Sequence, residues 1–287
     1  MKVTGLWIGA LAVSLCRLSA QVKVEVVLNQ EQFLPSETLQ VEVQVANRSG
    51  QTLHLGGDPG WLTFSVEGHD SHVVPRTGIV PVVGEFTLPS SKRALKRVDL
   101  APYFSLTKAG HYSVTATVTI KEWKEQFVSK PAEFDIIDGT PIWEQEVGVP
   151  NAARATNRPP ELRKYALQEA NYLKQLMLYL QVTDDAGRIY KVFPIGPMLS
   201  FGQPEARVDN VSNLHVLYQD GPHSFSYTEF TPNGDLILRQ TYDYTTRPRF
   251  AFDKDNRLQV IGGRRRIMPN DVPPPKTSKD DVRKSAP

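Results

Sequence analysis

Histidines and acids that lie close together are the residues of this sequence best suited to binding a metal ion. His69 and His72 flank Asp70, and His54 could add a third ligand, since Zn²⁺ accepts imidazole and carboxylate groups. A glycine and a proline bracket the segment, so we interpret it as an exposed loop that happens to contain two histidines. No metal ligand is therefore assigned.

His215 lies within an alternating strand pattern, and we interpret it as a packed or surface histidine, not as a catalytic base. The run 253–256 (Asp-Lys-Asp-Asn) is similar to the start of a calcium-binding loop. Such a loop needs a glycine at its sixth position and a glutamate at its twelfth, where this sequence has Leu258 and Arg264. Turn formation explains the acids better, because Asp and Asn side chains bond the backbone of turns.

The usual enzyme signatures are missing from the sequence. It has no Gly-x-Ser-x-Gly elbow, no His-Glu-x-x-His pair and no glycine-rich phosphate loop. The missing signatures make an enzyme less expected. They do not exclude one, because active sites can also be assembled from scattered loop residues. We predict a protein that is not an enzyme, with no catalytic residue and no cofactor.

The charge of the chain argues against two classes of partner. Basic residues cluster at 92–97 and at 264–266. A patch for an anionic polymer is one interpretation, but we favour solvated strand edges that discourage aggregation. The formal charge is +2 and falls to zero if a leader containing Lys2 and Arg17 is removed. A neutral chain has no long-range field to attract nucleic acid or an anionic membrane, so we expect neither partner.

Residues 1–20 have the pattern of a secretory signal peptide. Lys2 gives a positive start, an apolar run follows, and Leu18-Ser19-Ala20 places a small residue at the cleavage position. The run is too short to be a stable transmembrane segment. Cys16 offers the alternative of lipid attachment, although the leucine before it and the arginine after it are atypical of that motif. Cleavage after residue 20 leaves no cysteine, which favours a bacterial periplasmic or secreted protein.

Residues 21–138 are predicted to form consecutive strands. Apolar and polar residues alternate over 22–28, 39–46 and 112–120, and turn-forming residues separate these runs. Further strands are expected at 53–55, 61–66, 82–88, 97–100 and 127–137. Seven or eight short strands without a helix signal between them are typical of a β-sandwich.

This segment resembles the immunoglobulin-like domains of macroglobulins and exported bacterial proteins. The resemblance rests on residues 34–39 (Leu-Pro-Ser-Glu-Thr-Leu), which lead into a strand that ends Val45-Ala46-Asn47, and on residues 106–112 (Leu-Thr-Lys-Ala-Gly-His-Tyr). It implies that Tyr112 forms a tyrosine corner, with its hydroxyl bonded to nearby backbone. The cysteine pair of antibody domains is missing, so that subtype is excluded.

A linker is predicted at residues 139–162, which contain four prolines and few apolar residues after Trp143. Ile142 and Trp143 could pack onto one of the two units. The second unit covers residues 163–268, with a strand at 175–182 that runs into a hairpin turn at 184–187. Residues 163–172 fit both a helical face and a strand, with strand favoured.

The second unit contains an internal repeat. Val208, Phe230 and Phe252 are 22 residues apart, and each enters a turn from which an alternating strand leaves. Residues 213–218 (Asn-Leu-His-Val-Leu-Tyr) and 257–263 (Arg-Leu-Gln-Val-Ile-Gly-Gly) resemble β-propeller blades of exported bacterial proteins. The unit is too short for a closed ring, so we expect a partial propeller or an open meander, with a small two-layer sandwich or closure by association with another chain as alternatives. Most aromatics between 225 and 252 are predicted to be core, and residues 269–287 to be disordered.

These patterns predict an all-β fold, with an immunoglobulin-like sandwich followed by an antiparallel hairpin-repeat domain. The function that we expect is that of an exported, non-enzymatic binding or scaffolding protein of the bacterial envelope, with a protein or glycan partner. Two alternatives stay open. One is an envelope enzyme or protease-inhibitor-like protein with a site between the domains. The other is a subunit of a larger assembly, whose open sheet another chain completes.

Overall fold

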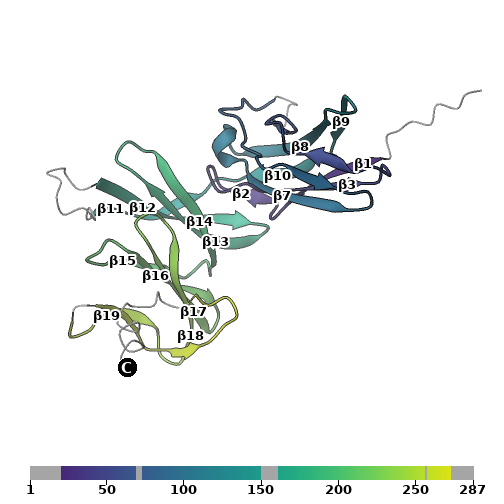
Figure 1. Cartoon of the computed structure of the whole chain (residues 1–287). Coiled ribbons are helices and arrows are strands. Elements are labelled where there is room, and N and C mark those ends of the chain that lie inside the picture. The colour runs from purple at the N-terminus through teal and green to yellow at the C-terminus, as the bar shows by residue number, and fades with distance from the viewer. Residues whose placement is uncertain (1–20, 69–72, 150–160, 256, 273–287) are drawn as a thin grey trace, which may run out of the picture.

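The structure is a computed structural model that describes residues 21–68, 73–149, 161–255 and 257–272. They form two β units, an N-terminal sandwich and a C-terminal stack of sheets, with one short 3-10 helix, η1 (Ala101–Tyr103), in the sandwich (Figure 1). The expected signal peptide with Cys16 and the loop with His69, Asp70 and His72 lie outside the described residues. No helix in the described ranges is long and apolar enough to cross a membrane.

The N-terminal sandwich consists of two main sheets. One has the order β1 (Val22–Leu28), β3 (Gln40–Asn47), β7 (Arg93–Asp99). The other has the order β2 (Gln32–Phe33), β10 (Ala132–Ile136), β8 (Gly110–Ile120), β5 (Leu62–Gly68), and β9 (Glu125–Val128) pairs with the end of β8. A ribbon of β4 (Leu53–Leu55) and β6 (Phe86–Leu88) completes the unit. The strand pairs are antiparallel except β2 with β10, which is parallel.

Alternation along the strands builds the core of the sandwich. In β8 every second residue from Tyr112 to Ile120 is buried, and in β1 the buried Val22 and Val24 flank the exposed Lys23. The buried faces of the two sheets meet in one hydrophobic core. The hydroxyl of Tyr112 donates a hydrogen bond to the carbonyl of Lys108 at 2.8 Å, which confirms the predicted bond from this tyrosine to nearby backbone.

Two predicted strands of the sandwich differ from the observed ones. Of residues 82–88 only Phe86–Leu88 is a strand, because the carbonyl of Val82 accepts a bond from the indole of Trp61 at 3.1 Å instead of joining a ladder. The strand expected at 127–137 divides into β9 and β10 at Ser129, whose hydroxyl accepts the amide of Ala116 at 3.0 Å. Pro131, just beyond, has no amide to offer a ladder.

The second unit contains three antiparallel sheets, which begin in chain order, although the last strand of the second sheet follows the third sheet in the chain. The first has the order β11 (Thr140–Val149), β12 (Glu161–Tyr172), β13 (Gln175–Thr183), β14 (Ile189–Pro197). The second has the order β15 (Glu205–Val208), β16 (Leu214–Gly221), β17 (Ser224–Phe230), β18 (Leu236–Asp243), β21 (Arg264–Arg266). The third is the hairpin of β19 (Arg249–Phe252) and β20 (Leu258–Ile261).

The predicted linker at 139–162 is wrong for Thr140–Val149, which is strand β11 paired with β12, and for 161–162, where β12 begins. β11 is an edge strand with mostly exposed side chains, and only Trp143 and Val147 pack on the core, so no alternation marks it in the sequence. An edge strand also tolerates Pro141, where the register shifts. Residues 163–172 are strand, as favoured, and the predicted strand at 175–182 is confirmed.

The predicted disordered tail begins too early at residue 269. Val272 exchanges two backbone hydrogen bonds with Arg239 of β18, both at 3.1 Å, and the amide of Asp271 bonds the carbonyl of Met268. Residues 269–272 are therefore part of the second unit, and residues 273–287 lie outside the described part of the chain.

The middle sheet of the second unit is buried on both faces. On one face Leu214, Val216 and Tyr218 pack against the first sheet, through residues such as Leu180 of β13. On the other face Leu217, Phe225 and Tyr227 pack with Phe250 and Val260 of the β19–β20 hairpin. The three sheets are thus stacked in chain order, and the described residues form an open meander without a closed ring (Figure 1). The predicted core role of most of the aromatics is confirmed, whereas Tyr244 and Phe252 are exposed.

The internal repeat is a repeated turn. Asp184, Asp209, Thr231 and Asp253 each donate their backbone amide to the carbonyl four residues later. In every case a side-chain oxygen of that first residue also accepts backbone amides of its own turn. In the first three turns the fourth residue has a positive φ, 78° at Gly187, 68° at Ser212 and 83° at Gly234. The 22-residue spacing in the sequence therefore reflects the same turn geometry in successive hairpins.

The two units pack on each other through a small hydrophobic cluster. Leu34 and Ile137 of the sandwich contact Ala170, Tyr179 and Val192 on the outer face of the first sheet of the second unit. Beside them the side-chain oxygen of Gln32 accepts the amide of Leu173 at 2.9 Å. These contacts join the two units through side chains as well as through the chain itself.

Candidate functional site

A groove runs along one side of the sandwich, between an edge strand of each sheet. It has a volume of about 740 Å³ and is lined by β1 from Val22 to Val27 and by residues 126–128, 130 and 131, including Phe127 and Val128. In the described part of the chain β1 pairs only with β3, and β9 pairs only with β8. The groove is therefore bordered by two strand edges whose outward backbone groups are free to pair.

The groove exposes apolar side chains at the positions where an added strand would contact them. Val27 is 45% exposed and Val128 is 61% exposed, while the partly buried Phe127 packs on the core between the sheets. The remaining walls are mixed in charge, with Lys23, Glu25 and Lys130. An extended segment that lies here could bond the backbone of β1 and place alternate apolar side chains on this surface.

The opposite edge of the same sheet has a different character. β7 is also a terminal strand, and Leu95, 56% exposed, lies between Arg93 and Arg97, with Arg97 Nε bonded to Glu42 at 2.9 Å. The second basic cluster, at 264–266, is β21, the terminal strand of the middle sheet of the other unit. Both basic clusters thus lie on sheet edges, where charge opposes pairing with another chain.

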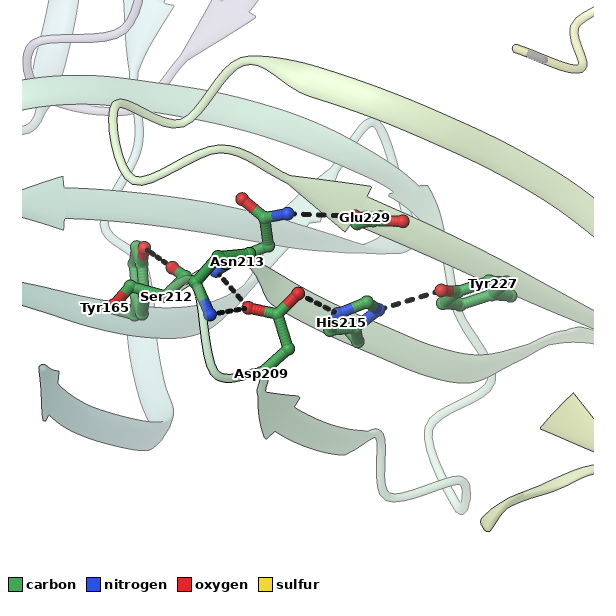
Figure 2. Close-up of polar contacts among 8 residues, drawn as sticks. Tyr165, Asp209, Ser212, Asn213, His215, Tyr227 and Glu229 are labelled. Atoms are coloured by element: carbon green, nitrogen blue, oxygen red, sulfur yellow. Dashed lines mark hydrogen bonds and ion pairs between the residues drawn. The ribbon is translucent and has the colours of Figure 1, made fainter. Parts of the chain in front are cut away.

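A second polar arrangement surrounds His215 in the stacked unit (Figure 2). His215 Nδ1 lies 2.8 Å from the hydroxyl of Tyr227, and Nε2 lies 3.3 Å from Oδ2 of Asp209. Glu229 is directly across from His215 in the register of β16 and β17, and one of its oxygens accepts the side-chain amide of Asn213 at 3.0 Å. One ligand atom from each of Asp209, His215 and Glu229 lies within 4.8 Å of the other two.

Packing fixes the imidazole of His215. The ring stacks on Tyr227 with an interplanar angle of 11° and meets Phe250 edge-on, and the residue is 5% exposed. Burial raises the pKa of the Tyr227 hydroxyl, and the charge of Glu229 raises it further. Tyr227 therefore stays protonated at neutral pH and serves as a hydrogen-bonding partner of the histidine, not as a nucleophile.

The residues singled out in the sequence are placed as follows. His215 is packed, as predicted, and Asp253 caps its own turn through amides of residues 255 and 257, as expected for turn chemistry. His54 lies exposed on β4, and its proposed partners are outside the described residues, so that trio stays untested.

Sequence reasoning missed Asp209 and Glu229 as neighbours of His215. Asp209 is the first residue of the repeated turn, six positions before the histidine, and Glu229 faces the histidine from the next strand. The hairpin register between β16 and β17 was the signal that could have found the second of them.

Comparisons with known proteins give no family. No protein-family model matches the chain, and a search of curated proteins finds no match. Among solved structures, Spo0M, a sporulation control protein from Bacillus subtilis, aligns with a TM-score of 0.30 and 11% sequence identity, over 59% of this chain and 82% of that chain. A similarity of this degree carries no argument about function.

Proposed function

We propose that this protein is an exported, non-enzymatic binding protein whose N-terminal sandwich takes up an extended peptide segment of a partner protein as an added strand along β1. The observation that carries the proposal is the groove of about 740 Å³ between the two unprotected edges β1 and β9, with Val27 and Val128 exposed beside it. Strand addition gives affinity through backbone hydrogen bonds and specificity through alternate side chains.

The contrast between the edges of the sandwich supports this choice. The edge at β7 carries Arg93 and Arg97, which discourage pairing, whereas the β1 edge offers Val27 and a wall with both signs of charge. An immunoglobulin-like assignment, which we also keep as a proposal, is supported by the two-sheet arrangement and by the corner bond of Tyr112.

The groove between the two units gives the alternative of an enzyme little support. It has a volume of about 610 Å³, and the charged groups that line it are Asp99 and Lys191. Asp99 accepts the backbone amides of Leu39 and Ala101, and Lys191 pairs with Asp235 at 2.7 Å. Both groups have structural partners, so the groove presents no free acid–base pair.

The test uses a displayed library of random peptides about ten residues long, enough to cover a strand. Selection on the full chain should enrich sequences with apolar residues at alternate positions. An enriched peptide should bind at least tenfold more weakly, about 1.4 kcal/mol, when its alternate backbone amides are methylated. Equal binding of the methylated peptide would exclude strand addition, and a selection without enrichment would argue against the whole proposal.

Matched variants locate the binding surface. Val27→Lys and Val128→Lys place a charge in the groove at exposed positions and should weaken the enriched peptide about tenfold, whereas Leu95→Lys, equally exposed on the β7 edge, should leave its affinity unchanged. The export part of the proposal is checked by mass spectrometry of the protein recovered from its host, with Gln21 expected as the first residue.

A further inference from the structure

We propose that Asp209, His215 and Glu229 together bind one divalent transition-metal ion of the Zn²⁺ type, at the end of the middle sheet of the stacked unit (Figure 2). This site is separate from the groove of the sandwich and does not depend on the function proposed for it. The argument rests on the distances among the three side chains, on what holds each of them, and on how this turn differs from its repeats.

The distance between His215 and Asp209 fits two ligands of one ion better than a direct ion pair. Nε2 and Oδ2 are 3.3 Å apart. Charge-assisted N–H···O bonds are usually about 2.7–2.9 Å long. Two ligands about 2.0–2.1 Å from a tetrahedral ion lie about 3.3–3.4 Å from each other. A carboxylate oxygen of Glu229 lies within 4.8 Å of a ligand atom of each of these two residues, so Glu229 is the third candidate ligand.

His215 and Asp209 are each held by their other polar atom, which leaves Nε2 of the histidine and Oδ2 of the aspartate facing each other. Nδ1 of His215 bonds the hydroxyl of Tyr227, and Oδ1 of Asp209 accepts the backbone amides of Val211 and Asn213 at 3.0 and 2.8 Å. The amide side chain of Asn213 holds Glu229. Metal ligands in proteins are typically oriented in this way by outer partners.

The other copies of the turn show that this arrangement is more than turn chemistry. Thr231 caps its turn with a single hydroxyl oxygen, so the second oxygen of Asp209 is not needed for capping. The sixth residue after the first residue of the turn is His215 here, but Tyr190, Ile237 or Gln259 in the other copies. Of the four turns, the one that begins at Asp209 thus combines a histidine with a carboxylate oxygen that capping does not need.

Burial and ligand type select the ion. The imidazole is almost fully buried while the Asp209 side chain is 20% exposed, so the ion would enter from the carboxylate side and keep water as a further ligand. One imidazole with two carboxylates favours Zn²⁺ over Ca²⁺ or Mg²⁺, which prefer oxygen ligands alone. Arg207, the exposed cross-strand neighbour of His215 on β15, is the one basic residue beside the site in the register.

The test is calorimetric titration of the metal-stripped full chain with Zn²⁺. We expect one ion per chain for the natural protein and for Asp253→Asn, the matched change in a turn that lacks the histidine. Asp209→Asn keeps the capping oxygen, and His215→Gln keeps a polar side chain. Each should weaken Zn²⁺ at least tenfold, within the usual range for changes in or beside a metal's ligand shell.

A spectroscopic measurement keeps the result clear if a variant folds poorly. Co²⁺ bound to the natural chain should show the intense visible absorption of a tetrahedral ion, displaced by Zn²⁺ in equal amount. Binding that survives Asp209→Asn and His215→Gln, or binding that disappears in a His69→Ala/His72→Ala double variant, would place the ion elsewhere and overturn the proposal. Absence of stoichiometric binding would overturn it as well.

Discussion

Glu37 is a carboxylic acid buried where the sandwich meets the second unit. It is 4% exposed, and its two oxygens accept bonds from the amide of Leu34 at 2.8 Å and from the side chain of Gln30 at 2.7 Å. Burial raises its pKa above the usual value of a glutamate, and the two hydrogen bonds only partly offset this. Burial raises the pKa of the nearby Tyr179, and the charge of Glu37 raises it further.

Replacement of Glu37 by glutamine tests whether the pKa of this carboxyl is raised in the folded chain. A carboxyl whose pKa is higher in the folded state stabilises the fold below its unfolded pKa, and this contribution is lost as the pH rises through the folded pKa. The natural chain should therefore lose stability relative to Glu37→Gln as the pH rises above about 4, the usual pKa of a glutamate, in urea unfolding at each pH. The exposed Glu122→Gln serves as control and should show no such trend. A constant difference between the natural chain and Glu37→Gln would contradict the assignment.

The hydrogen-bond partners of a residue can be predicted from the sequence when they are close in the chain, and not when they come from distant segments. The bond of Tyr112 was expected from the resemblance to immunoglobulin-like domains, and its partner, Lys108, is only four residues away, in the loop before β8. Asn47-Arg48-Ser49 is formally a glycosylation sequon, but Asn47 is 1% exposed and its side chain bonds the carbonyls of Gln51 and Leu88, so it is not accessible for modification. The neighbours of His215 come from a turn and from another strand, and only the register brings them together.

Among the elements, the repeated turns offer a pair of substitutions that separates backbone strain from packing. Gly187 and Gly234 hold the same position in two turns, with φ of 78° and 83°. A side chain added at Gly187 would meet nothing within 4 Å, whereas one at Gly234 would lie 3.0 Å from Lys191 and 3.1 Å from Val182.

Gly187→Ala should therefore lower the free energy of unfolding by about 1 kcal/mol, the strain of a left-handed residue. Gly234→Ala should lower it by that amount and by about 1–3 kcal/mol more for overpacking. Chemical denaturation of both variants measures the difference. Equal losses would mean that the turn around Gly234 yields freely to the extra methyl group.

Alternation predicted the strands that have one buried face and failed for the others. β8 buries every second residue from Tyr112 to Ile120, and β1 and β3 alternate in the same way over their first residues, as their sequences show. β11 is an exposed edge with prolines near it, and its pairing partner, not its own pattern, makes it a strand. β16 was expected as an alternating strand, and it is a strand, but its first five residues are all buried, so the burial of its second face under the third sheet was not foreseen.

At the scale of the whole molecule, the contact between the units should make them unfold together. Leu34 is 2% exposed and lies in the cluster with Ala170, Tyr179 and Val192. Leu34→Ala removes most of this side chain at a cost of about 2–5 kcal/mol, which falls largely on the contact between the units.

Calorimetry should show one transition for the natural chain and two for Leu34→Ala. Leu88→Ala, a similar truncation within the sandwich core, should lower the stability of the sandwich without this loss of coupling at the junction. Two transitions already present in the natural chain would mean that the cluster is too small to couple the units.

The stacking of three sheets in chain order has a consequence for how the protein is made. Each sheet covers the one synthesised before it, so a chain emerging from the ribosome can bury each layer as soon as the next one is complete. The aromatic face with Phe225 and Tyr227 stays uncovered longest, because the β19–β20 hairpin that shields it is synthesised after strands β15 to β18. A chain truncated just after β18 would expose this aromatic face to solvent. Such an exposed apolar surface is a target for chaperones and proteases.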